Sequence, residues 1–380
     1  MNLVATSLRP IAPPEKGALE RIREIAERDL RPVVPWIDEK GFYPLNVLKK
    51  LGEAGAFSQH HSGFGESDAV DVGLAIRAMS IVAEECLSTA FCTWCHDAFG
   101  WYLQNTENSS LRETLQAAAA RGAVIGGTGL SNPMKTLSGI ETMKLRGERV
   151  AGGYRVNGLL PWVSNIEDGH YFGVCFDADA QGARRIAALA QLGVNGVFGR
   201  KGAAFIALEG TATRAVAFKD AFVPDDFVLS ESLPDFAKRI RAGFILLQTG
   251  MAVGLARNCA RLMRELTARS QLLNAYLSVG PVEIEDRLEE LEHEVMLLAD
   301  TPFEEDGEYV ERVLRARLAG SSLALAASEA LMLHAGARAY IKGSVYSRRL
   351  RESYFIAIVT PATKHLLMDL AAIKRASRSQ

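Results

Sequence analysis

The 380-residue sequence has few cysteines, no long uninterrupted apolar run and almost no net charge. Each shortage excludes a class of protein. Five cysteines, an odd number, argue against a framework of disulfides. No apolar run reaches the ~18–20 residues that cross a membrane, and the N-terminus shows no secretory signal. We therefore expect a cytoplasmic protein with reduced thiols and no membrane partner.

The charge balance also limits the possible partners. Lysine and arginine number 43 and the acidic residues 45, giving a net charge of −2, so nucleic acid is not an expected ligand. Hydrophobic residues make up 48% of the chain, as in a soluble globular protein of two or three domains. No His, Cys or Asp cluster has the spacing of metal ligands, so we expect no metal site.

The segment Cys92-Thr93-Trp94-Cys95-His96 has the spacing of a covalent haem attachment site. Such attachment needs an exported chain, and the segment lies inside a largely apolar stretch. Buried cysteines on a helix are therefore the favoured interpretation.

Local patterns divide the chain into three parts. Residues 15 to about 121 show apolar positions at helical spacing, and this period returns after Leu233. Between them lie short β-branched or aromatic runs separated by glycines, as in a mostly antiparallel sheet. We predict an α+β fold with an N-terminal α-helical domain (1–121), a middle antiparallel β-domain (122–232) and a C-terminal four-helix bundle (233–380). The expected strands are Ala123–Ile125, Gly153–Asn157, Tyr171–Phe176, Ala204–Leu208 and Arg214–Phe218.

Several short motifs occur in a fixed order along the chain. GYRVNG at residues 153–158 leads into PWVSN at 161–165, and LSNP lies upstream at 130–133. VAFKDAFVP follows at 216–224, GMAVGLA at 250–256, and GARAY at 336–340 precedes the pair Arg351-Glu352. Each motif alone is weak. In this order and at these separations, they resemble the acyl-CoA dehydrogenase family across nearly the whole chain.

The resemblance implies an FAD cofactor and residues that hold it. A flavin needs hydrogen-bond donors along its edge and an aromatic or apolar wall against one ring face. By resemblance, Trp162 and Ser164 supply that wall and a hydroxyl near the reactive edge, and Leu130 and Ser131 contact the pyrimidine side. Trp162 in isolation would be read as an ordinary buried aromatic. Arg269, retained from an anchoring motif, would pair with the pyrophosphate, and Gly336 belongs to the glycine motif.

The sequence departs from the family where the catalytic base is expected. The family's glutamate, which removes the α-proton of the thioester, corresponds to Thr360, and its alternative location on a helix corresponds to Phe244. A threonine hydroxyl is no base near neutral pH without a partner of its own. Two flavin-contacting polar residues of the family are also replaced, by Met332 and Ala362. We expect weak FAD binding, or reduced flavin taken as a co-substrate.

Three functions fit this pattern. The first is a flavin-dependent oxidoreductase acting on an acyl-CoA or a similar small molecule. The second is a reduced-flavin-dependent monooxygenase of the same fold, which needs no α-proton base. There Ser164 would stand near the flavin, and His96 or His365 would hold the flavin hydroperoxide, because a histidine pKa lies near physiological pH. Both histidines also have ordinary interpretations, as a hydrogen-bonded helix residue and a partly exposed one. The third function is a non-catalytic binding or regulatory protein.

Two further expectations concern surfaces. The run Arg348, Arg349 and Arg351 predicts a solvated helix face or an inter-subunit pair, with binding of CoA or flavin phosphates as the alternative. By resemblance, the C-terminal helices should assemble the chain into a homotetramer, or at least a homodimer.

Overall fold

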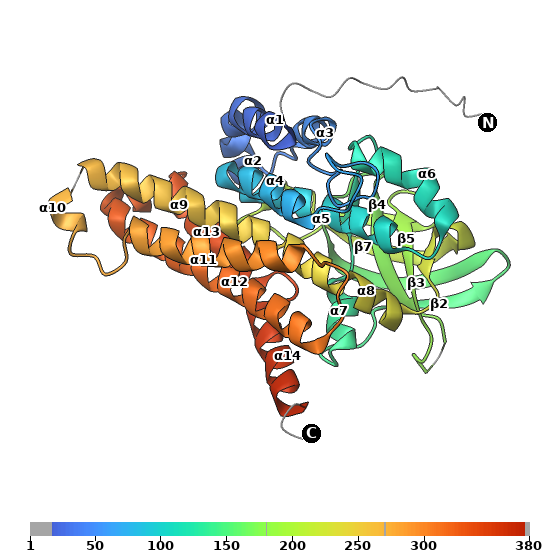
Figure 1. Cartoon of the computed structure of the whole chain (residues 1–380). Helices are drawn as coiled ribbons and strands as arrows, with labels where there is room; N and C mark the ends of the chain where they lie inside the picture. The colour runs from blue at the N-terminus through green and yellow to red at the C-terminus, as the bar shows by residue number, and fades with distance from the viewer. Residues whose placement is uncertain (1–16, 180, 270, 377–380) are drawn as a thin grey trace.

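The computed structural model describes residues 17–179, 181–269 and 271–376, with the side chains of residues 269 and 271 left out. Helices come first along the chain, then a sheet, then helices again (Figure 1). This order agrees with the predicted α+β class. The division at residues 121 and 232 stays a prediction, although the last N-terminal helix ends at Ala120 and the last strand at Ser230.

Helix α5 (Leu87–Asn105) is the centre of the N-terminal part, and all its residues from Leu87 to Leu103 are buried. A helix that is apolar all round belongs inside a protein. The residues with haem-like spacing lie on it, and all five cysteines of the chain are buried and free. The neighbouring helices are α1 (Ala18–Ile25), α2 (Val34–Lys40), α3 (Leu45–Glu53), α4 (Val72–Glu85) and α6 (Ser109–Ala120).

The middle part is an eight-stranded sheet with the strand order β6-β7-β3-β2-β4-β5-β8, and β1 pairs with β4. Neighbouring strands in the sheet are antiparallel, with two exceptions. Strand β1 pairs with β4 in parallel, and β2 makes a single parallel pairing with β4. Side chains at alternate positions along the strands form a hydrophobic core that is separate from the core of the helical parts. The strands are β1 (Gly126–Thr128), β2 (Leu145–Val150), β3 (Gly153–Val163), β4 (Tyr171–Asp177), β5 (Arg185–Gln191), β6 (Val197–Lys201), β7 (Arg214–Pro224) and β8 (Val228–Ser230).

The C-terminal helices α9, α11, α12 and α13 run side by side, away from the sheet (Figure 1). Asp306 caps the start of helix α12, where its carboxylate accepts from two backbone N–H groups, and Gly336, whose φ is 56°, follows the last helical residue. The helices are α8 (Leu233–Leu247), α9 (Thr249–Arg269), α10 (Gln271–Asn274), α11 (Pro281–Ala299), α12 (Gly307–Ala335), α13 (Val345–Ile358) and α14 (Thr363–Ala376).

Two strand predictions were wrong, and one helix was missed. Residues 204–208 form bends rather than a strand, and the strand expected at 123–125 begins only at Gly126. The helical period that returns after Leu233 is interrupted at Gln248, between α8 and α9. The missed helix, α7 (Ser131–Leu137), contains a proline and only seven residues, too few for a helical period to be recognised.

The arginine run joins the two helical parts instead of facing solvent. Arg349 is fully buried and donates to the Ala83 carbonyl at the end of α4, and Arg348 donates to the Glu85 carbonyl. Glu352 accepts from both arginines and from the Leu87 N–H at the start of α5. Arg348 and Arg349 therefore neutralise the carbonyl end of one helix, which corrects the solvated-face and phosphate-binding interpretations.

Two helical stretches, residues 307–340 and 345–376, are long and apolar enough to cross a membrane by length and composition alone. The sequence predicted no membrane span because polar residues interrupt both stretches, so neither contains a long uninterrupted apolar run. In the structure, α12 packs against α9, α11 and α13, as a core helix of a bundle does.

Candidate functional site

A cavity of about 400 Å³ lies where the three parts of the chain meet. Helix α5 supplies Phe91 and Trp94, α8 supplies Phe244, and α13 supplies Phe355. Two pairs of rings pack edge to face, Phe91 with Phe355 at 4.5 Å and Trp94 with Phe244 at 5.0 Å between centroids, and Phe91 is stacked on Trp94. One end of the cavity is therefore apolar and suited to a hydrocarbon group. We call it the central cavity.

The sheet side of the central cavity carries hydroxyl groups. Ser164, just after β3, lies 2.7 Å from the Thr213 hydroxyl, and Thr213 lies 2.7 Å from the Thr211 hydroxyl. Thr128 on β1 is the fourth hydroxyl here, 2.7 Å from the Tyr102 phenol. Trp162 stands on the same wall with 56% of its surface exposed. An exposed aromatic ring beside several donors fits one face and one edge of a flavin ring.

Thr360 closes the cavity on its third side. Its hydroxyl lies 2.9 Å from the Ser131 hydroxyl of α7, and its carbonyl accepts from the Gln248 side chain at 2.8 Å. Behind Gln248, the buried Arg317 donates to the Gln248 side-chain oxygen at 2.7 Å and to the Ile356 carbonyl at 2.7 Å. Burial lowers the pKa of Arg317 to about 10, and it remains a cation near neutral pH. Arg317, on α12 inside the bundle, thus stabilises the turn after α13 through Gln248.

Charge is scarce in the central cavity. No aspartate or glutamate is among the described residues that line it, and Lys135 is the one lining residue with a charged side chain. Lys135 donates to Glu141 at 3.0 Å. Asn132 and Lys135 bind the Glu141 carboxylate, and these contacts lower its pKa although partial burial opposes the shift. The cavity therefore offers hydroxyls and one cation, but no carboxylate.

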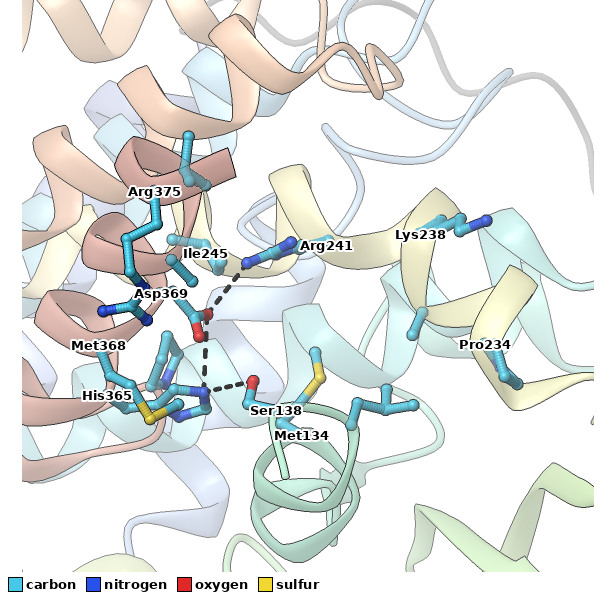
Figure 2. A pocket seen from close by; sticks show the side chains of 15 residues that line it. Met134, Ser138, Pro234, Lys238, Arg241, Ile245, His365, Met368, Asp369 and Arg375 are labelled. Atoms are coloured by element: carbon cyan, nitrogen blue, oxygen red, sulfur yellow. Dashed lines mark hydrogen bonds and ion pairs between the residues drawn. The ribbon is translucent and has the colours of Figure 1, made fainter. Parts of the chain in front are cut away.

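A second cavity of about 600 Å³ lies on the other side of the same turn (Figure 2). Pro361 and Ile245 line it, directly beside Thr360 and Phe244 of the central cavity. Its rim carries the cations Lys238, Arg241 and Arg375 and the carboxylate of Asp369, which pairs with Arg241. We call it the outer cavity. An elongated ligand that passes this turn would contact both cavities, with any anionic end near the three cations.

His365 and Ser138 meet inside the outer cavity (Figure 2). The Nε2 atom of His365 lies 2.8 Å from the Ser138 hydroxyl and 3.6 Å from Asp369, which pairs with Arg241 at 3.1 Å. Burial lowers the pKa of His365, and Asp369 opposes this shift. Serine and aspartate approach the same ring nitrogen, whereas a hydrolase triad has them on opposite nitrogens. The group ties α7, α8 and α14 together.

The structure brings only part of the predicted site together. Trp162, Ser164, Ser131 and Thr360 line the central cavity, whereas His365 lines the outer one. The other predicted residues are elsewhere. Leu130 is buried outside the cavity lining, Gly336 ends α12, and the side chain of Arg269 lies outside the described residues.

His96 is buried but does not line the central cavity. Its Nδ1 accepts from the Gly126 N–H at 3.0 Å, so its Nε2 carries the proton and donates to the Ala119 carbonyl at 2.9 Å. Burial lowers the pKa of His96 to about 4. The hydrogen bonds of the two ring nitrogens fix the start of β1 relative to α6. A role of His96 in proton transfer would require breaking one of these two hydrogen bonds.

Sequence reasoning missed Lys135, Thr128, Thr211 and Thr213. Lys135 follows Ser131 by four residues, which places both on one face of a helix, but α7 was not predicted. The threonines gave no signal because Thr128 lies far along the chain from Thr211 and Thr213, and only the tertiary structure brings the two segments to one cavity.

No protein-family model matches the chain, but distant relatives exist. A benzylmalonyl-CoA dehydrogenase of Aromatoleum aromaticum is 25% identical over 247 residues, which span 64% of this chain and 65% of that protein. A short-chain-specific acyl-CoA dehydrogenase of Clostridium acetobutylicum is 24% identical over 65% of this chain and 67% of its own length.

Solved structures extend the likeness to nearly the whole chain. Butyryl-CoA dehydrogenase of Megasphaera elsdenii is 17% identical with a TM-score of 0.81, and the match covers 93% of this chain and 96% of that one. Dibenzothiophene monooxygenase of Paenibacillus sp. A11-2 is 16% identical with a TM-score of 0.77, over 93% and 96%. The predicted fold is therefore confirmed. The chain thus shares the fold of these proteins and is distantly similar in sequence to two dehydrogenases of CoA esters.

Proposed function

We propose that the chain is a flavin-dependent oxidoreductase that binds FAD and acts on an acyl-CoA-type thioester. The central cavity carries this proposal, because it sets an exposed aromatic ring and hydroxyls opposite an apolar end. Trp162 would cover one ring face, and Ser164 and Thr128 would supply hydrogen bonds along the edge. The relatives named dehydrogenases of CoA esters support the substrate class.

The bound flavin would supply the electron transfer, and the chain would place the substrate. The acyl group would lie among the apolar rings of Phe91, Trp94, Phe244 and Phe355. The polar end of a CoA ester would follow the turn at Thr360 into the outer cavity, toward its rim of cations. We further propose that Thr360 replaces the family's catalytic glutamate. The absence of carboxylates from the described lining supports this assignment. A dehydrogenation removes an α-proton as well as a hydride, so the base for that proton would have to come from outside this described lining.

A reduced-flavin-dependent monooxygenase is the second candidate. Two observations favour it: the cavity lining without a carboxylate and the shared fold with dibenzothiophene monooxygenase. In this case the Ser131 and Thr360 hydroxyls, 2.9 Å apart, would hydrogen-bond an oxygen-bearing group instead of removing a proton from carbon. The cytoplasmic location and the homotetramer stay predictions.

Flavin titration and one anaerobic assay test the proposal. The purified protein should bind FAD or FMN, seen as quenching of flavin fluorescence and a shift of its visible absorbance. Added butyryl-CoA should bleach that absorbance without oxygen if the chain is a dehydrogenase. A monooxygenase would instead need a flavin reductase, NADH and oxygen to turn over. Protein that binds neither oxidised nor reduced flavin would refute the oxidoreductase proposal and favour a non-catalytic binding protein.

A further inference from the structure

Lys135 is placed where it would select among acyl groups. It lies four residues after Ser131 on α7, so the two side chains share one face of the helix, about 5–6 Å apart at Cβ. Ser131 contacts Thr360 at one end of this interval. Both residues line the central cavity. A group bound beside Thr360 is therefore within one helical turn of a cation, a span that a short acyl chain bridges.

The charges around Lys135 leave it available to a ligand. Its partner Glu141 also accepts from Asn132 at 3.0 Å and lies 3.8 Å from Lys144. If the Lys135 ammonium turned from Glu141 to a ligand, Asn132 and Lys144 would still stabilise that carboxylate. The three charged side chains carry a net charge of +1. The Lys135 side chain is 27% exposed, so an ion pair formed there is partly shielded from water and salt.

The rest of the cavity gives this cation no other anionic partner. Its described lining is aromatic, aliphatic or hydroxylic, with no aspartate or glutamate. The buried guanidinium of Arg317 stands behind the turn at Thr360, and none of its hydrogen-bond partners among the described residues is a carboxylate. The one charged side chain in the described lining is therefore a cation, which favours an anionic acyl group over a neutral one.

We propose that the central cavity selects acyl thioesters whose acyl group ends in a free carboxylate, and that Lys135 binds this carboxylate. The inference rests on the proposed function, because it assumes that a thioester occupies the cavity. The ammonium donates hydrogen bonds to the carboxylate oxygens, while the aromatic end packs against the methylene groups. Lys135 is then a specificity-determining residue.

Paired ligands of equal length test this proposal on the FAD-loaded protein. Glutaryl-CoA carries a terminal carboxylate, and pentanoyl-CoA is its uncharged counterpart. Dissociation constants come from the change in flavin absorbance or from calorimetry. We expect glutaryl-CoA to bind about tenfold more tightly than pentanoyl-CoA, as for one partly buried charge-assisted contact. In Lys135→Met the ratio of the pentanoyl-CoA to the glutaryl-CoA dissociation constant should fall to about one, because only glutaryl-CoA binding is weakened. Lys135→Arg should retain most of the preference for glutaryl-CoA.

Lys144→Met is the matched control, because Lys144 also faces Glu141 but is not among the described residues lining the cavity. It should keep the wild-type ratio. Three results would overturn the inference. The wild type could show no preference between glutaryl-CoA and pentanoyl-CoA, Lys135→Met could weaken the binding of both CoA esters equally, or Lys135→Met could weaken the binding of FAD instead. The last two results would assign Lys135 to the CoA moiety or the flavin, with the proposed function intact. A wild type that binds neither FAD nor CoA ester would refute that function and this inference with it.

Discussion

Thr360 illustrates how a single residue depends on neighbours far away in the sequence. Its hydroxyl is paired with Ser131, and its carbonyl is bound by Gln248, which is in turn bound by Arg317. Gln248 is fully buried in the gap between α8 and α9. Its amide is suited to this place because one end accepts from the guanidinium while the other donates to the carbonyl.

Replacing Gln248 by glutamate separates these two contacts. Gln248→Glu keeps an acceptor for Arg317 but has no N–H for the Thr360 carbonyl. We expect amide hydrogen exchange in residues 358–362 to accelerate about tenfold, with little change in α12, because the turn loses a buried hydrogen bond while Arg317 keeps its partner. Mass spectrometry of peptic peptides measures both regions in the protein without any ligand.

Gln191→Glu provides the control for this experiment. The Gln191 amide also donates to a backbone carbonyl, that of Gly169 at 2.9 Å, but in the sheet domain. Exchange at residues 358–362 should be unchanged in this variant. If it were also unchanged in Gln248→Glu, the turn would not depend on Arg317 and Gln248.

At the scale of elements, α13 holds the chain together. Its residues Arg348 and Arg349 bind the last carbonyls of α4, and Glu352 binds both arginines and the first N–H of α5. Arg351, from the same helix, pairs with Asp38 at 2.9 Å and donates to the Ile206 carbonyl. One helix thus contacts the N-terminal helices and the segment after β6.

Removing the charge of Glu352 should therefore be costly. Glu352→Gln leaves two buried arginines without a carboxylate, and breaking such a pair lowers the free energy of unfolding by about 3–5 kcal/mol. Denaturation in guanidinium chloride, followed by circular dichroism, measures the loss. Glu294→Gln removes a similar but exposed pair with Arg312, and it should cost at most about 1 kcal/mol. Equal losses in the two variants would contradict a central role for α13.

At the scale of the whole molecule, the C-terminal helices expose apolar side chains to solvent. Leu333 on α12, Tyr354 on α13 and Leu367 on α14 are 60%, 54% and 51% exposed. The stretch from 345 to 376, apolar enough to be a candidate membrane span, is only partly covered within one chain. Because α12 packs against both α13 and α14, we infer that these exposed apolar side chains contribute to a surface that another protein chain covers.

We expect the purified protein to be a homo-oligomer, a tetramer or at least a dimer, in light scattering. Leu333→Glu should shift the distribution toward smaller species, because it places a charge on the apolar face of the bundle. Leu159→Glu is the matched control. Leu159 is 52% exposed on β3, in the sheet domain, and its substitution should leave the mass unchanged. A monomeric wild type would exclude assembly through these helices.

Particular elements show how far the sequence alone predicts this protein. The long helices α5, α11 and α12 follow from sustained apolar periods, and the motif order predicted the fold. Trp162, Ser164, Ser131 and Thr360 were named by resemblance, and the structure places all four around one cavity. The strand predicted at 204–208 was wrong because an apolar run of five residues is compatible with either a strand or an irregular loop.

The sequence by itself determined which residue types are present, including the threonine at position 360 and the absence of a long uninterrupted apolar run. Only the tertiary structure decided that Lys135 lines the cavity and that Arg317 lies behind it. Helical and strand periods report contacts between neighbours along the chain. The Ser131–Thr360 contact beside Lys135 instead joins residues 229 positions apart, and the Arg317–Gln248 contact joins residues 69 positions apart. Arg348 and Arg349 read as solvated charges for the same reason, since their burial is compensated by carbonyls about 265 residues earlier in the chain.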